Sequence, residues 1–220
     1  SEGKVQLWLR PLDRTGAQLL AGAEGATDPF WSPDGQSIGF FADGKLRRID
    51  AAGGPALTLA EGPGRISARG GAWSSTGEIL FSSDRGVLQR VSAMGGAAVE
   101  ATKLADGEST HRRPSFLPDG KHFLYAAGAG GSTAPKAIRL GSLDGLESTK
   151  LIDKADSGAV YSAGYLLFLR GETLMAQPFD VRLLALTGNA VPVMENVPGG
   201  GVGTSQGFSA SALGLLVHAS

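Results

Sequence analysis

The 220-residue chain contains no cysteine, so it has no disulfide, no thiolate metal site and no cysteine nucleophile. It has no excess charge of one sign either, because 20 lysine and arginine residues face 21 aspartate and glutamate residues. This balance gives no electrostatic case for nucleic acid or an anionic membrane as a partner. No apolar run approaches the roughly 18 residues that span a bilayer, so we expect no membrane insertion by this chain.

The composition is that of a folded chain rich in turns. Hydrophobic residues make up 42% of the sequence, charged residues only 19%, and 34 positions are glycine. Such a chain is too apolar to be disordered and long enough to bury a core. We therefore predict one domain over residues 1–220. The chain opens with Ser1-Glu2-Gly3 and without an initiator methionine, and we expect it to be processed or cut from a longer protein.

A short motif recurs along the chain: an aromatic or apolar residue, a polar stretch and a turn glycine. Clear copies occupy residues 31–35 (WSPDG), 73–77 (WSSTG) and 116–120 (FLPDG), and weaker copies occupy 160–164 and 208–214. Their turn glycines are 42, 43, 44 and 50 residues apart. A nearly continuous apolar run follows each copy, which is typical of a strand covered on both faces.

Each unit continues with a strand that ends at glycine and with a further short apolar segment. Four strands in about 44 residues is the size of a β-propeller blade. We therefore predict an all-β fold, a β-propeller of about five four-stranded blades. The repeats are expected at approximately 25–60, 68–103, 111–152, 157–195, and 207–220 together with 1–24.

The phase of the repeats gives a prediction about closure of the ring. The chain begins with the third and fourth strands of a blade, around Val5 to Leu20, and ends with the first and second strands, around Phe208 to Val217. These two halves would form one composite closing blade and a complete ring. The alternative is an open fragment of a larger propeller, with unpaired blade faces at both ends.

Two local features carry further structural expectations. Asp43-Gly44 is a tight-hairpin dipeptide, because glycine adopts positive φ without a Cβ clash. Trp31, Trp73 and Phe116 occupy one equivalent position in three repeats, and we expect them to pack between blades.

The repeated WSPDG motif, followed by an apolar strand and a strand ending in Gly-Gly, resembles the WD40-like repeats of TolB-type propellers. Stretches such as VQLWLRPLD, DPFWSPDG and HRRPSFLPDGKHFLY are similar to the C-terminal propeller of bacterial membrane-anchored serine/threonine kinases. This resemblance covers most of the chain. It implies that a cytoplasmic kinase and one membrane helix precede the propeller, which would then be extracytoplasmic.

A candidate ligand site follows from the loops that enter the innermost strands. These loops carry Asp28, Arg69, His111 and Arg112, and the corresponding loops of a propeller gather around one mouth of the central channel. Arginine and histidine together would bind a small anionic ligand, such as a carboxylate, phosphate or sugar acid, or the acidic end of a peptide. The alternative is that these are solvated loop charges.

No catalytic signature of a hydrolase, metalloprotease, nucleotide-binding protein or kinase occurs in the chain. We predict no catalytic residue, no cofactor and no metal, and a sensor or interaction domain as the function. The alternatives are the propeller of a hydrolase or peptidase, a propeller lyase, and a stand-alone scaffold for protein partners.

Overall fold

The computed structural model describes residues 5–11, 13, 15–61, 66–83, 86–129, 137–198, 207–211 and 216–218. These residues form 21 strands and no helix, which confirms the all-β prediction. Consequently, the described part of the chain contains no helix that could cross a membrane.

Four sheets of four or five antiparallel strands follow one another along the chain, and we call them the first to fourth blades. The first blade contains β3 (Thr27–Trp31), β4 (Ser37–Ala42), β5 (Lys45–Asp50) and β6 (Leu57–Glu61). The second contains β7 (Ile66–Trp73), β8 (Glu78–Ser83), β9 (Leu88–Ser92) and β10 (Val99–Glu100). The third contains β11 (Thr110–Phe116), β12 (His122–Gly128), β13 (Ala137–Ser142) and β14 (Gly145–Ile152). The fourth contains β15 (Val160–Ser162), β16 (Tyr165–Arg170), β17 (Thr173–Asp180), β18 (Ala185–Leu186) and β19 (Val191–Met194).

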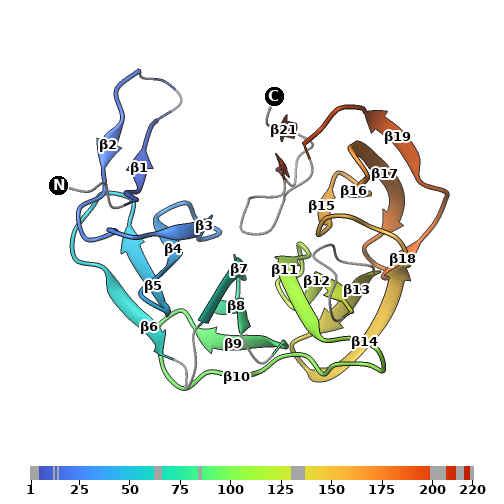
Figure 1. The fold of residues 1–220 in the computed structure, drawn as a ribbon, viewed down its shortest axis with the longest axis horizontal. Coiled ribbons are helices and arrows are strands. Elements are labelled where there is room, and N and C mark those ends of the chain that lie inside the picture. Colours follow the sequence, from blue (N-terminus) through green and yellow to red (C-terminus); the bar gives the residue numbers. More distant parts are fainter. Residues whose placement is uncertain are drawn as a thin grey trace.

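Two short hairpins flank the four blades, and they do not join. One is β1 (Trp8–Leu9) with β2 (Gln18–Leu19), and the other is β20 (Phe208–Ala210) with β21 (Leu216–His218). They form separate sheets, and Figure 1 shows them at opposite ends of an open arc with β3, β7 and β11 along its inner side. The predicted composite closing blade is therefore wrong for this structure, and the open arrangement that was its alternative is what the described strands adopt.

Each hairpin instead packs on its neighbour in sequence. Leu7, Leu9 and Leu20 join a buried cluster with the first blade. At the other end, buried Phe208 packs with Leu169 of the fourth blade, and the Ser162 hydroxyl donates a 2.7 Å hydrogen bond to the Ser211 carbonyl. Because β1 and β2 pair over only two residues each, they offer little edge for a further strand.

The core is divided among the interfaces between neighbouring sheets. One buried cluster lies between the first and second blades, including Phe41, Leu46, Ile79 and Phe81. Further clusters join the second blade to the third and the third to the fourth. Full burial of one such Leu, Ile or Phe side chain contributes about 1.5–3 kcal/mol. The arc is thus stabilised one interface at a time, as expected for repeated units.

The hairpin prediction is confirmed at the turn between β4 and β5. Asp43 and Gly44 have φ values of 52° and 73°, so both central residues adopt the left-handed conformation that a tight two-residue hairpin needs.

The prediction for the aromatic residues is only partly right. Trp73 and Phe116 pack against the buried clusters that face their preceding blades, but Trp31 remains 51% exposed. The sheet that precedes the first blade has only two strands, so it covers less of this face. On the opposite face of β3, the Phe30 ring packs into the interface with the second blade. A Cβ on Gly39 or Gly71 would overlap this ring, so both positions require glycine.

Candidate functional site

The inner strands of the first three blades share an irregularity at one position, three residues before the repeated aromatic. This position holds Asp28, Gly70 and Arg113, with φ values of 44°, 99° and 51°. The strand register shifts across each of them, as it does in a β-bulge. A left-handed conformation at a residue other than glycine costs about 1–3 kcal/mol of folding free energy, and such strain occurs often at ligand sites. Asp28 and Arg113 are therefore candidates for a binding role.

The second of these positions cannot hold a larger residue. A Cβ on Gly70 would lie 2.9 Å from the Arg113 Cα, and the φ of Gly70 is also unfavourable for a side chain. The close approach brings the bulge of β7 directly against the bulge of β11. Glycine in the second blade therefore makes room for arginine in the third.

Three arginines and one aspartate gather around these bulges, and we call Asp28, Arg69, Arg112 and Arg113 the inner-strand charge cluster. Burial lowers the pKa of Arg112, and the positive charges of Arg69 and Arg113 lower it further. Burial also lowers the pKa of Arg113, and the carboxylate of Asp28 partly opposes this. For Asp28, burial raises the pKa and Arg113 opposes the rise. The cluster therefore carries a surplus of positive charge in a partly desolvated setting.

The structure assigns the residues predicted from the sequence to two different places. Asp28, Arg69 and Arg112 belong to the inner-strand charge cluster, together with Arg113, which the sequence analysis did not select. The signal for Arg113 was present, because it stands three residues before Phe116 just as Asp28 stands three before Trp31. His111 lies elsewhere.

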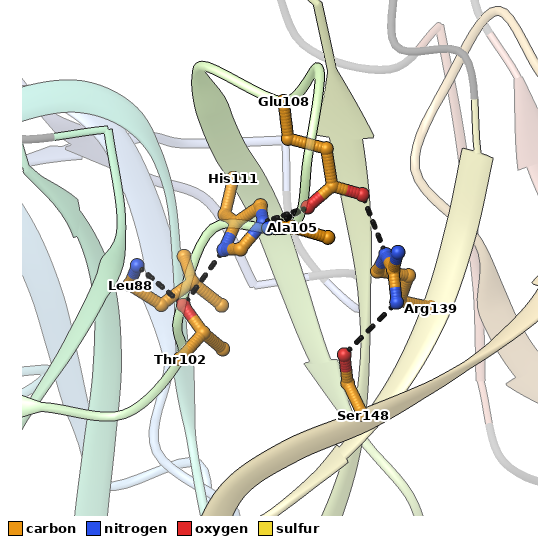
Figure 2. A network of polar contacts seen from close by, with 7 residues as sticks. All are labelled: Leu88, Thr102, Ala105, Glu108, His111, Arg139 and Ser148. Carbon is orange, nitrogen blue, oxygen red and sulfur yellow. Dashed lines mark hydrogen bonds and ion pairs between the residues drawn. The ribbon is translucent and has the colours of Figure 1, made fainter.

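His111 is a strand residue with a fully buried ring, so the prediction that it lies at the channel mouth is wrong. Its Nδ1 lies 2.8 Å from the Thr102 hydroxyl, and its Nε2 lies 3.0 Å from Oε2 of Glu108 (Figure 2). The Tyr125 ring packs beside it, with 4.7 Å between ring centroids. The side chain is held inside the interface between the second and third blades.

The same network continues from Glu108 to the next strands of the third blade. Oε1 of Glu108 accepts a 2.6 Å hydrogen bond from Arg139 Nε, and Arg139 Nη1 donates to the Ser148 hydroxyl at 3.2 Å (Figure 2). Oε2 also accepts the backbone N–H of Ala105 at 2.9 Å. One loop carboxylate therefore ties together the entry of β11 and strands β13 and β14.

The pKa shifts describe a neutral histidine beside an ionised glutamate. Burial lowers the pKa of His111 below 6.5, and Glu108 opposes the decrease only in part. Burial acts to raise the pKa of Glu108, but the hydrogen bonds that it accepts outweigh this and lower it below 4.5. The ionised carboxylate thus accepts from His111 Nε2, and Nδ1 accepts from the Thr102 hydroxyl.

Thr102, His111 and Glu108 have the order of a nucleophile, a base and an orienting acid. However, the Thr102 side chain is 1% exposed, His111 is 0% exposed, and the Thr102 oxygen already accepts the Leu88 N–H at 2.9 Å. A substrate has no access to this hydroxyl, so the network is structural. Within the described residues, no group of three or more histidine, aspartate and glutamate side chains is arranged to hold a metal ion.

No family model matches the chain, and a search of curated proteins finds no match. Solved structures do match. A TolB-type protein from Agrobacterium tumefaciens is 18% identical with a TM-score of 0.61, over 79% of this chain and 65% of that one. A gluconolactonase from Xanthomonas campestris is 15% identical with a TM-score of 0.65, over 87% of this chain and 68% of that one. A puromycin hydrolase is 17% identical with a TM-score of 0.55, over 84% of this chain and 32% of that one.

These likenesses concern the fold. The chain spans about two thirds of the TolB-type protein and of the gluconolactonase, and about a third of the hydrolase. At such identities the match extends to architecture and not to activity. Together with the consecutive antiparallel sheets, they show that this chain has a β-propeller fold.

Proposed function

We propose that this chain is a non-catalytic binding domain whose inner-strand charge cluster holds a small anion or the acidic end of a peptide. The observation that carries the proposal is the gathering of three arginines on adjacent inner strands, where Arg112 lies within the field of Arg69 and Arg113, and Asp28 is an acidic member of the cluster.

An anion in this cluster would relieve the repulsion that Arg112 experiences from its two arginine neighbours. Guanidinium groups suit carboxylate and phosphate, because they donate paired hydrogen bonds in a fixed plane. Asp28 would hold Arg113 in its charged form beside the ligand.

The ionic network around His111 supports a role without catalysis. His111 has both ring nitrogens engaged and no exposed surface. An enzyme built on this fold, such as a lyase or hydrolase, would need a base that reaches a bound substrate.

For the parent protein we propose the sensor of a bacterial membrane-anchored serine/threonine kinase, with the propeller on the extracytoplasmic side. Support comes from the motif resemblance over most of the chain and from the propeller fold. The gene product upstream of residue 1 tests this: a kinase domain followed by an apolar helix of about 20 residues supports it. A signal peptide leading directly into the propeller would contradict it.

The binding proposal is tested by calorimetric titration of the chain with inorganic phosphate, glucuronate and a short peptide ending in two glutamates. Arg112→Ala and Arg69→Ala should weaken binding of the preferred probe by roughly tenfold to a hundredfold, the scale for a charged hydrogen bond. Arg182→Ala is the matched control, because Arg182 is an exposed arginine of the fourth blade. The proposal fails if no probe binds, if Arg112→Ala and Arg69→Ala bind like the parent chain, or if Arg182→Ala loses as much affinity as they do.

A further inference from the structure

A cleft of about 470 Å³ opens between the first and second blades, at the turns that follow their inner strands. Its walls are the β3–β4 turn with Ser32 and Asp34, Arg48 from β5, and the β7–β8 turn with Trp73 and Ser75. The volume lies within the range of small-molecule sites, about 300–1,000 Å³.

The same place is closed one interface further along. The Ser74 hydroxyl donates a 2.5 Å hydrogen bond to the Gly120 carbonyl, which belongs to the equivalent turn of the third blade. A Cβ on Gly120 would collide with the Ser75 hydroxyl, so these two turns are in direct contact. The cleft therefore marks an interface where the turns of adjacent blades stand apart.

Arg48 and Arg90 show the same difference between the two interfaces. They are equivalent, because Arg48 pairs with Gly39 in the first blade as Arg90 pairs with Leu80 in the second. Arg90 reaches across to the third blade and donates a 2.8 Å hydrogen bond to the Leu143 carbonyl. Among the described residues, no hydrogen bond or ion pair engages the guanidinium of Arg48, although it lines the cleft.

The cleft is also lined by the anionic Asp34, from the β3–β4 turn of the same blade. Hydrogen bonds from the Ser32 hydroxyl and the Gln36 N–H lower the pKa of Asp34, so it is ionised at neutral pH. Both bonds go to Oδ1, which leaves Oδ2 available as an acceptor in the described structure. Trp73 adds a half-buried aromatic surface to the wall.

We infer that this cleft is a second binding site, for an uncharged, hydroxyl-rich ligand such as a pyranose unit of a saccharide. A hydroxyl group accepts from a guanidinium and donates to a carboxylate, so one sugar ring satisfies both Arg48 and Asp34. The apolar face of the ring packs on Trp73.

The pairing of charges argues against an anionic occupant. A carboxylate or phosphate drawn to Arg48 would lie near the ionised Asp34, and Asp50, which accepts a hydrogen bond from Ser37 on the cleft wall, adds a further acidic residue. The cleft thus differs in ligand class from the inner-strand charge cluster, so each of the two sites can be disproved without the other.

The test is a titration of the chain with maltotriose, cellotriose and chitotriose, followed by the NMR signal of the Trp73 indole N–H. At least one saccharide should shift this signal at millimolar concentration, and Arg48→Met should weaken the effect about tenfold or more. Asp34→Asn should weaken it too, because the amide retains an acceptor but loses the charge. Arg182→Met serves as the control for loss of an arginine outside the cleft.

Three results would overturn the inference. One is the absence of any Trp73 shift with all three saccharides at tens of millimolar. Another is an unchanged titration in Arg48→Met, whose folding is checked by its thermal unfolding. The third is a stronger response to glucuronate than to the neutral sugars, which would place an anion in the cleft.

Discussion

The interface between the first and second blades and the interface between the second and third differ in what holds them together. In the first interface an aromatic ring, Phe30, fills the space left by Gly39 and Gly71. The second interface is crossed by polar contacts: His111 with Thr102, Ser74 with Gly120, and Arg90 with Leu143. Both have an apolar core, and the first is also crossed by a 3.2 Å hydrogen bond from the Gly96 N–H to the Leu59 carbonyl. The two differ at the turns that follow the inner strands, which are hydrogen-bonded through Ser74 and Gly120 in the second interface and stand apart around the cleft in the first.

The difference shows that residues at equivalent positions of a repeated fold do not all contribute to packing between blades. Arg90 fastens two blades, whereas its equivalent Arg48 faces a cleft. At the bulge, Gly70 has no side chain and so allows β11 to approach closely, whereas the equivalent residues Asp28 and Arg113 are charged. Candidate binding groups therefore occur where one copy of a structural position is no longer needed for packing.

The largest effect on stability is expected from removing the Phe30 ring from the interface between the first and second blades. Phe30→Ala removes the ring that fits against Gly39 and Gly71 and leaves a cavity, so the free energy of unfolding should fall by about 3–5 kcal/mol. Urea unfolding followed by tryptophan fluorescence measures it. Trp31→Ala is the control, because that side chain is 51% exposed and should cost clearly less. Equal losses of unfolding free energy for the two variants would contradict the assignment of Phe30 as the residue that fills this interface.

A somewhat smaller loss is expected where the inner strands touch. Gly70→Ala places a Cβ 2.9 Å from the Arg113 Cα at a φ of 99°, and strain with overpacking should cost about 2–3 kcal/mol. The reverse change at an equivalent position, Arg113→Gly, relieves the left-handed strain at φ 51°. Thermal unfolding measures the stability of both variants. A Gly70→Ala variant as stable as the parent would show that β7 and β11 do not approach as described.

The second interface should respond to pH through His111. Because the pKa of His111 is lowered below 6.5 on folding, the unfolded chain binds more protons than the folded chain as pH falls below that value. Stability is therefore level above about pH 6.5 and declines below it, by at most about 1.4 kcal/mol per pH unit for one proton. Below about pH 4.5 the lowered pKa of Glu108 adds to the decline.

Urea unfolding at a series of pH values measures this dependence. His111→Gln should be less stable than the parent at pH 7, and its stability should lose the component between pH 6.5 and the onset of carboxylate titration. An identical pH profile in the variant and the parent would mean that another group is responsible.

The smallest effects concern the two equivalent arginines. Arg90→Met removes a hydrogen bond between blades and should cost about 1–2 kcal/mol. Arg48→Met removes a guanidinium that makes no hydrogen bond or ion pair with a described residue and keeps most of the apolar stem, so the change should stay within about 0.5 kcal/mol. Parallel denaturation curves give both values, and a loss at Arg48 that matches the loss at Arg90 would place Arg48 among the structural contacts.

The sequence predicted those parts of the fold that depend on local pattern. The recurring turn motif and the apolar runs after it identify β4, β8 and β12, and the Asp43-Gly44 dipeptide identifies a hairpin, because backbone sterics alone determine it. Local pattern could not predict closure of the ring, because closure depends on whether two hairpins distant in sequence pair with each other or pack on their neighbours. The exposed Trp31 has the same origin: its repeat position is right, but the sheet that should cover it has only two strands.

The candidate sites were only partly predictable for similar reasons. Loop equivalence identified Asp28, Arg69 and Arg112 but missed Arg113, although Arg113 has the same spacing from Phe116 that Asp28 has from Trp31. The backbone bulge at both positions shows that this spacing is meaningful. His111 misled, because alternation along β11 does not reveal that Thr102 and Glu108 enclose its ring. The cleft beside Arg48 depends on how two turns are spaced, which no periodicity encodes.

The central claim is that the inner strands hold an anion at the arginines of the charge cluster. The most direct measurement is an NMR titration of the isotopically labelled chain with glucuronate and, separately, with methyl glucoside. The account predicts that glucuronate shifts the amide signals of Gly70, Gly71 and Arg113, that methyl glucoside at the same concentration does not, and that Arg112→Ala abolishes the glucuronate shifts. Glucuronate shifts that spare these amides, or that persist unchanged in Arg112→Ala, would contradict it.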